Sequence, residues 1–276
     1  MVWQRDVDLV VPLWQGGDDV RVAPGSAALA RQVPSGGSRL HISVTDGPRQ
    51  VVGGVLNLET VAQTQRRIRD RLARRDPART LTLGGDCASD LAAVQHLAAR
   101  HPGMSCYWVD AHPDLNTPES SPSGRAHGMV LRALLGEGHG LLTGGGAALA
   151  ARDVTLVGTR SFDPAEAEFV RARGLAVAGP EEVAADPEGV AFRRTAGSPA
   201  YVHLDVDVCD PAEVPAVAVP EPGGPQVEAV ARVLAAVARH HTVVGIGVCE
   251  YAPVIEHDPK RLNVLLSALG LCDPAV

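Results

Sequence analysis

The chain has 276 residues, of which 45% are hydrophobic and 21% charged, and its formal net charge is -7 with a pI near 5.8. This length allows one large α/β domain or two small ones, and the lack of an interdomain linker favours one domain over residues 1–276. The acidic balance argues against nucleic acid or an anionic membrane as partner, because no basic surplus is available to neutralise phosphates, and it suits a cationic substrate.

The cysteines are odd in number and include no Cys-x-x-Cys pair; they occupy positions 87, 106, 209, 249 and 272. Most lie in apolar surroundings, which is typical of reduced, buried thiols in an intracellular protein. Cys87 differs because it follows Gly-Gly-Asp at the end of an apolar segment. The first ten residues lack the apolar core of a secretory signal, and no apolar run approaches the roughly 18 residues of a membrane helix. We therefore expect a cytoplasmic protein.

Apolar strands and helices alternate through the first half of the chain. Short apolar runs predict strands over 7–13, 40–44, 80–83 and 105–110. Helices are expected after Pro24, over 57–75 with Asn57 as the N-cap, and from Ser89 or Asp90 to Arg100. Apolar residues at helical spacing support the long helix over 57–75.

The second half continues the alternation. Strands are predicted over 152–157, 175–178, 201–205 and 242–248, and helices over 164–173, 226–240 and 259–269. Residues 180–195 are expected to be helical or irregular, and the glycine-rich segment 136–146 is expected to be a surface loop. Alternation of this kind, with nearly continuous apolar strands, predicts a three-layer α/β/α fold with a mostly parallel central sheet.

Two segments place acids and imidazoles on one strand face. In the first, within 107–129, Asp110 and His112 project together, and Pro113 turns the chain so that Asp114 swings back toward them. The second, YVHLDVD over 201–207, repeats the pattern with a histidine and two aspartates. Carboxylates gathered in a core repel one another unless a cation neutralises them, so the pattern predicts a divalent metal, most economically two ions that share carboxylates.

The alternative is that these acids are ordinary turn and capping residues, which are common at strand ends. The recurrence of the pattern in two segments, with an imidazole in the first, favours the metal site. Acids also follow two other strands: Asp86 comes after the strand over 80–83, and Glu250 comes after the strand over 242–248. Parallel strands open on one edge, so four separate segments are expected to meet at one pocket.

Five motifs, in this order, resemble the arginase/agmatinase family, the ureohydrolases. They cover most of the chain between about 84 and 253, and they read GGDC (84–87), DAHPDLN (110–116), SGRAHGM (123–129), DVDVCDP (205–211) and CEYAP (249–253). The resemblance implies two manganese ions bridged by Asp110 and Asp205. It further implies that His112 and Asp207 complete the shell of one ion, and that Asp114 belongs to the other.

The same resemblance assigns the chemistry. A metal-activated hydroxide attacks the guanidinium carbon, Asp114 takes the proton, His127 serves as proton shuttle, and Glu250 pairs with the guanidinium. The residues matching those that hold a substrate α-carboxylate are Asn116, Ser121 and Ser123, and those matching contacts to the α-ammonium group are Asp163 and Glu166. This set favours an amino-acid substrate over its decarboxylated form, although each residue could be an ordinary loop cap.

Cys87 departs from the family pattern, in which histidine follows Gly-Gly-Asp and ligates the first manganese. Thiolate is soft and manganese is hard, so Cys87 is expected to weaken the ion on its side, to leave that ion absent, or to change its identity. His203 stands where the family usually carries serine. It shares a face with Asp205 and is either a packed, hydrogen-bonded partner of the site or a surrogate ligand.

In having a cysteine at this position, the chain resembles family members that convert Nω-hydroxy-L-arginine to L-ornithine and hydroxyurea in antibiotic biosynthesis. Nω-hydroxy-L-arginine is therefore the favoured substrate. A plain arginase that releases urea is one alternative. A non-catalytic binding protein that has lost one metal through Cys87 is another, disfavoured because Asp114, His127 and Glu250 are retained. Family members often form trimers or hexamers, so a homo-oligomer remains open.

Overall fold

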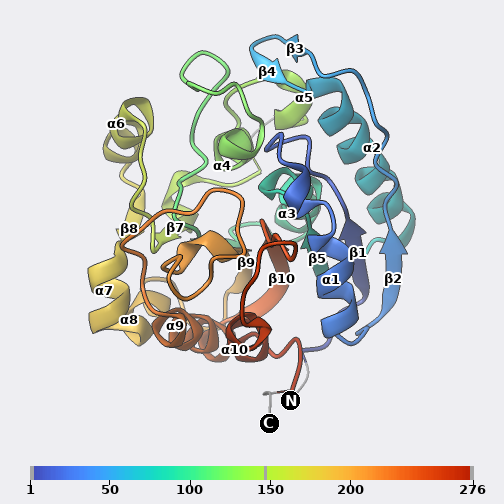
Figure 1. Ribbon diagram of the computed structural model, residues 1–276. Helices are drawn as coiled ribbons and strands as arrows, with labels where there is room; N and C mark the ends of the chain where they lie inside the picture. The colour runs from blue at the N-terminus through green and yellow to red at the C-terminus, as the bar shows by residue number, and fades with distance from the viewer. Residues whose placement is uncertain (1–2, 146–147, 274–276) are drawn as a thin grey trace.

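The computed structural model describes residues 3–145 and 148–273. Within them the chain forms an eight-stranded sheet with the order β2-β1-β5-β10-β9-β6-β7-β8, in which all neighbouring strands are parallel (Figure 1). The strands are β1 (Val7–Val11), β2 (Ser38–His41), β5 (Thr80–Gly84), β6 (Ser105–Val109), β7 (Val154–Val157), β8 (Ala176–Ala178), β9 (Pro199–Asp205) and β10 (Thr242–Cys249).

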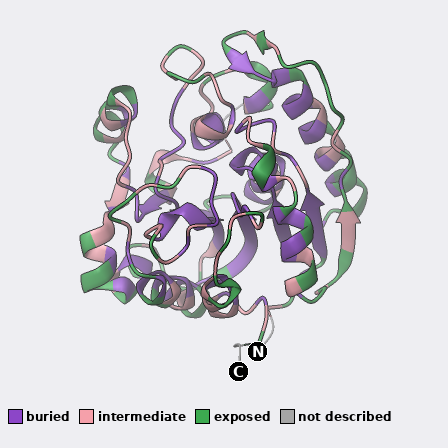
Figure 2. Ribbon diagram, in the orientation of Figure 1, coloured by how far each residue is buried: buried purple, intermediate pink, exposed green. Residues whose placement is uncertain are grey.

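Helices cover both faces of the sheet, which confirms the three-layer α/β/α expectation. One face packs against α1 (Gly25–Gln32), α7 (Pro180–Ala185), α8 (Pro187–Ala191), α9 (Val227–His240) and α10 (Pro259–Ala268). The other packs against α2 (Leu58–Arg75), α3 (Leu91–Arg100), α4 (Val130–Leu134), α5 (Gly140–Thr143) and α6 (Pro164–Arg173). Figure 2 shows the result, with buried strands inside and exposed residues on the outer surfaces of the helices. The central strands can therefore be apolar along their whole length.

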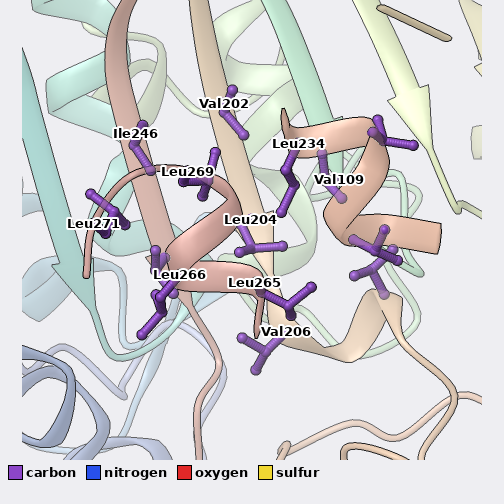
Figure 3. Packing of buried hydrophobic residues seen from close by; sticks show 14 of the residues in the cluster. Val109, Val202, Leu204, Val206, Leu234, Ile246, Leu265, Leu266, Leu269 and Leu271 are labelled. Atoms are coloured by element: carbon purple, nitrogen blue, oxygen red, sulfur yellow. The ribbon is translucent and has the colours of Figure 1, made fainter. Parts of the chain in front are cut away.

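Branched aliphatic side chains fill the layer between the sheet and the helix pair α9 and α10. Leu204 of β9 and Ile246 of β10 face Leu234 of α9 and Leu265 of α10 (Figure 3). These side chains are fully or almost fully buried. Each contributes on the order of 1.5–3 kcal/mol relative to an exposed position. This packing fixes β9 and β10 as the rigid centre of the molecule.

Short 3₁₀ helices occur at loop and strand ends. They are η1 (Val20–Val22), η2 (Cys87–Asp90), η3 (His127–Met129), η4 (Ala151–Asp153) and η5 (Val206–Val208). Two of them, η2 and η5, begin within three residues of the ends of β5 and β9. They turn the chain sharply above the sheet edge, so the side chains that follow these strands stay close to it.

Several local expectations need correction. Strand β2 lies at Ser38–His41 instead of 40–44, and a small antiparallel hairpin of β3 (Val51–Val52) and β4 (Val55–Leu56) was not expected. Asn57 is the N-cap residue of α2, as expected, but it has φ 54° and its side chain makes no capping hydrogen bond; the side chain donates to the Gln15 carbonyl at 3.0 Å instead.

The expected loop over 136–146 contains the short helix α5, and its last residue, Gly146, lies outside the described residues, as do the ends of the expected 1–276 domain. Residues 180–195 hold two short helices, α7 and α8. All the cysteines are free, and four of them are buried. Among the described residues, no helix combines the length and the apolar character needed to cross a membrane.

Candidate metal centre

Four neighbouring strands of the sheet, in the order β5-β10-β9-β6, carry the acids at their carboxyl ends. Because these strands are parallel, their carboxyl ends lie at one edge. The ends of these strands and the segments that follow them bring Cys87, Glu250, Asp205 and Asp110 to that edge. These four residues are 3% exposed or less. The centre of the sheet thus presents a buried group of acids and one thiol.

Asp110 is held at both carboxylate oxygens by its own segment. The Trp108 indole donates to Oδ2 at 3.1 Å, and the backbone N–H of His112 donates to Oδ1 at 2.7 Å. The alternation of strand side chains places Trp108 and Asp110 on the same face, which allows the first contact. The carboxylate therefore has a fixed orientation at the sheet edge.

His112 connects the end of β6 with the segment that follows β9. Its Nδ1 lies 3.0 Å from Asp207 Oδ2 and 3.6 Å from Asp110 Oδ1. The other oxygen of Asp207 accepts the backbone N–H of Ala111 at 3.1 Å. Ligand atoms of Asp110, His112 and Asp207 all lie within 4.8 Å of one another. Two carboxylates and an imidazole at this separation form a donor set for one divalent cation.

A second set gathers around Cys87. Its Sγ lies 3.1 Å from Asp205 Oδ2, and its backbone N–H donates to Glu250 Oε1 at 3.2 Å. Cys87, Asp205 and Glu250 form a second group of mutually close donors. Cys87, Asp110, Asp114 and His203 form a third, so Cys87 and Asp110 each belong to more than one group.

Two site residues have left-handed backbone conformations, which are uncommon outside glycine. Asp114 has φ 52° and Glu250 has φ 63°. Such conformations cost free energy and often occur where function constrains the backbone. The expectation that the chain turns after Pro113 describes Asp114 well: its buried side chain lies beside Asp110, and its Oδ2 has no hydrogen-bond partner within the described part of the chain.

Glu250 also contacts the loop segment that precedes α4. His127 Nδ1 lies 3.0 Å from Glu250 Oε1. The Gly16–Gly17 turn lies against the His127 imidazole. In addition, the His127 backbone N–H donates to the Gly16 carbonyl. Asp86 holds this turn by accepting the Gly17 N–H at 3.0 Å. Asp86, one of the acids expected at this edge, therefore supports the site by holding the Gly16–Gly17 turn.

Electrostatics in the cluster are unfavourable without a cation. Burial, and then repulsion by Asp207, raise the pKa of Asp110 to about 6. Burial and neighbouring carboxylates raise the pKa values of Asp114 and Asp205 well above their usual range. Burial alone would lower the pKa of His112, but hydrogen bonds to Asp110 and Asp207 raise it to about 12. A divalent cation removes this repulsion, and the oxygen-rich donor set suits manganese or a similar ion.

The cluster forms the floor of a cavity of about 190 Å³. All five residues expected to contact an amino-acid head line it: Asn116, Ser121, Ser123, Asp163 and Glu166. His127, Asp114 and Glu250 line it as well. A larger hollow of about 820 Å³ lies beside α2 and α3, but none of the donor groups found in the described residues lies there. The convergent acids identify the smaller cavity as the candidate site.

The cavity wall is held together by its own polar residues. Asn116 Nδ2 donates to Asp163 Oδ2 at 2.8 Å, which links the loop after β6 to the start of α6. Ser121 Oγ accepts the backbone N–H of Gly124 at 3.0 Å. Both carboxylate oxygens of Glu166 accept backbone N–H groups, one from Leu115 and one from Asp163, so this residue also ties the loop to α6.

The sequence is similar along most of its length to proteins of one known family. The model of the arginase family matches residues 15–270. An arginase from Bacillus caldovelox is 29% identical over 226 residues, which span 78% of this chain and 75% of that protein. Its crystal structure superposes with a TM-score of 0.85 at 25% identity, covering 99% of both chains.

Two further relatives were found. An Nω-hydroxy-L-arginine amidinohydrolase from Streptomyces lavendulae is 34% identical over 140 residues, spanning 50% of this chain and 48% of that protein. The crystal structure of an Entamoeba histolytica arginase in complex with L-ornithine superposes with a TM-score of 0.85 at 23% identity, covering 98% of this chain and 99% of that one. The latter likeness shows a shared fold.

Proposed function

The chain belongs to the arginase family, and we propose that it is a binuclear manganese amidinohydrolase that cleaves the guanidino group of an arginine-type amino acid. The observation that carries this proposal is the convergence of three overlapping donor groups beneath one cavity. Asp110 and Asp205 would be shared between the ions. The remaining ligands would be His112 and Asp207 for one ion, and Cys87 and Asp114 for the other.

When bound, two divalent cations supply Lewis acidity and a water molecule whose pKa is lowered toward neutrality. The protein's own groups supply the rest. Asp114 lies among the proposed ligands and lines the cavity, which suits its carboxylate to accept a proton during attack on the guanidino carbon. His127 lies at the cavity wall against Glu250, where it can carry a proton to the leaving amine.

Glu250 has the position and charge to bind the guanidino group. Its carboxylate lies next to Cys87 and His127 at the cavity floor. Burial alone would lower the pKa of His127, but the hydrogen bond to Glu250 raises it, so this pair keeps a proton available near neutral pH. A guanidino group that enters the cavity therefore meets a carboxylate, that of Glu250, which can accept its N–H groups.

The wall of the cavity suits an amino-acid head. Asn116, Ser121 and Ser123 offer neutral hydrogen-bond donors for an α-carboxylate. Asp163 offers a carboxylate for an α-ammonium group, with Asn116 fixing its orientation. Agmatine lacks the α-carboxylate and would leave the neutral donors without a partner, which disfavours it.

We further propose Nω-hydroxy-L-arginine as the substrate, with L-ornithine and hydroxyurea as products. Support comes from Cys87, since a thiol is a poor ligand for manganese, and from the Streptomyces lavendulae relative. A hydroxyguanidine is less basic than a guanidine and presents an additional oxygen for binding, so it places less demand on the metal site. L-arginine remains the second candidate because the curated arginases match a longer part of the chain.

The deciding experiment measures hydrolysis of Nω-hydroxy-L-arginine, L-arginine and agmatine while metal-free protein is titrated with manganese. We expect manganese-dependent hydrolysis, measured as L-ornithine release from the two amino acids and as putrescine release from agmatine, with the highest kcat/KM for Nω-hydroxy-L-arginine and the lowest for agmatine. A higher kcat/KM for L-arginine would overturn the hydroxyarginine assignment and leave an arginase. If none of the three substrates is hydrolysed in a metal-dependent way, the enzymatic proposal is overturned.

A further inference from the structure

His203 is a fully buried histidine beside the Cys87 group that the roles above do not use. It lies on β9 two residues before Asp205 and therefore on the same strand face. Its ring stacks on the indole of Trp108 in the adjacent strand β6, with centroids 3.6 Å apart and planes 9° from parallel. Trp108 also donates to Asp110, so one side chain orients both residues.

One ring nitrogen of His203 is fixed by a buried carboxylate. Nδ1 lies 2.9 Å from Asp90 Oδ2, and the Tyr201 hydroxyl donates to the other oxygen of Asp90. Gly247 of β10 makes room for this carboxylate, because a Cβ there would lie 2.0 Å from Asp90 Oδ2. A carboxylate acceptor requires a proton on Nδ1, which leaves the lone pair of a neutral imidazole on Nε2.

The second ring nitrogen has no partner. Over residues 3–145 and 148–273, neither His203 Nε2 nor Asp114 Oδ2 has a hydrogen-bond partner, and both atoms are buried. These residues belong to the same donor group, with Cys87 and Asp110, whose ligand atoms lie within 4.8 Å of one another. Unpaired buried polar atoms are rare because their desolvation is uncompensated. Two of them in one group point to a shared ligand.

We propose that His203 Nε2 is a protein ligand of the cation held by Cys87, Asp110 and Asp114, and that Asp90 positions its ring. This inference rests on the proposed function, since it requires the metal pair. A carboxylate that holds the far nitrogen of a metal-binding imidazole is a common arrangement, because it fixes the ring and its tautomer. The imidazole would give the Cys87 side a nitrogen donor and retain an ion that a thiol and carboxylates alone would hold weakly.

The competing explanation is that His203 and Asp90 form only a buried structural pair. That pair accounts for Nδ1 but leaves Nε2 unexplained, and it predicts no change in metal affinity when Nε2 is lost. Replacing His203 with Asn or with Gln distinguishes a metal ligand from a purely structural pair. The amide nitrogen of Asn can replace Nδ1 toward Asp90, whereas the longer Gln can place an amide oxygen near the position of Nε2.

Manganese binding to metal-free protein is measured by calorimetry and by the electron paramagnetic resonance signal of free Mn²⁺. Wild-type protein is expected to bind two ions per chain. His203→Asn is expected to weaken one of them at least tenfold and to leave the other nearly unchanged, and His203→Gln is expected to restore part of the loss. His241→Asn is the matched control, because His241 is buried at the other end of the sheet with both ring nitrogens hydrogen-bonded.

A second measurement needs no variant and so does not depend on His203→Asn folding. Wild-type protein labelled with ¹⁵N-histidine is loaded with Co²⁺, and hyperfine-shifted imidazole N–H signals are counted by NMR. We expect two, one from His112 and one from the Nδ1–H of His203.

The outcomes separate the two proposals. If wild-type protein binds two ions and His203→Asn binds both with unchanged affinity, or if only one shifted imidazole signal is seen, His203 is not a ligand, and the proposed function still stands. If wild-type protein binds neither Mn²⁺ nor Co²⁺, the proposed function itself fails.

Discussion

The thiol of Cys87 lies among carboxylates, where a thiolate is strongly disfavoured. Burial raises the pKa of this thiol well above its usual value, and the neighbouring Asp205 raises it further. If Cys87 is a ligand as proposed, cation binding has to displace a proton that the thiol holds up to an unusually high pH. At the residue scale, the proposed metal site is therefore expected to have its affinity limited at position 87.

We predict that Cys87→His tightens manganese binding by about tenfold or more, because imidazole suits manganese better than a thiol does. The measurement is calorimetric titration of metal-free protein. Cys106→Ala is the control, since Cys106 is also a buried free thiol but does not belong to any donor group of the described residues. No gain in affinity would mean that Cys87 is not a ligand.

A second prediction at this scale concerns Asp163. Replacing it with alanine should raise KM for the amino-acid substrate by roughly 10- to 100-fold, the expected loss from one charged hydrogen bond, with a smaller change in kcat. Steady-state kinetics provide the measurement. Glu168→Ala, which removes an exposed acid from the same helix, should leave KM unchanged. An unchanged KM in Asp163→Ala would favour a substrate without an α-ammonium group.

Sequence reasoning reached some site residues and missed others for a physical reason. The spacing of Asp110, His112 and Asp114 is local, so strand alternation and one proline suffice to bring them together. Asp90 gave no comparable signal, because its partners Tyr201 and His203 lie more than 100 residues away. Only the pairing of strands brings them into contact.

The same contrast holds for whole elements. Amphipathic periodicity located the start and end of α2 and α9 to within a residue. Strand β2 was misplaced toward the apolar residues after His41, because its position is fixed by pairing with β1, which aligns Val7 with Ser38. The two-residue strands β3 and β4 carry too few residues for any period to be visible.

At this scale, we predict an effect of close packing between β10 and η2. Gly247→Ala should push the Asp90 carboxylate away from His203, lower stability by about 1–3 kcal/mol and weaken manganese binding. Denaturant unfolding and metal titration measure the two effects. Gly140→Ala is the control, since a Cβ there meets nothing within 4 Å. Loss of stability with unchanged metal affinity would separate this packing from the metal site.

Across the whole molecule, the raised carboxyl pKa values couple metal binding to stability. Burial, and then Glu250, raise the pKa of Asp86 to about 7, and that of Asp110 is raised to about 6 from an ordinary value of 3.8. The folded metal-free protein therefore binds more protons than the unfolded chain between pH 3.8 and these values. Stability from these groups is consequently lost as pH rises through about 6 to 7.

We predict that the Tm difference between manganese-loaded and metal-free protein widens from about pH 5 to about pH 8, reaching on the order of 10 °C at saturating metal. At Asp110, which belongs to two donor groups, the cation replaces the lost proton and removes the repulsion between carboxylates. Differential scanning fluorimetry with and without a chelator measures this difference in Tm. A Tm difference that stays constant or narrows over this pH range would contradict a metal site built around Asp110.

The placement of β10 between β5 and β9 has a consequence for biosynthesis. The four strands that carry the site are adjacent in space, yet the last of them is made only when the ribosome has passed residue 249. Until then β5 and β9 cannot have their native neighbour, and their exposed edges are open to pairing with other chains. Metal capture by the proposed site can therefore begin only after Glu250, which follows β10, has emerged from the ribosome.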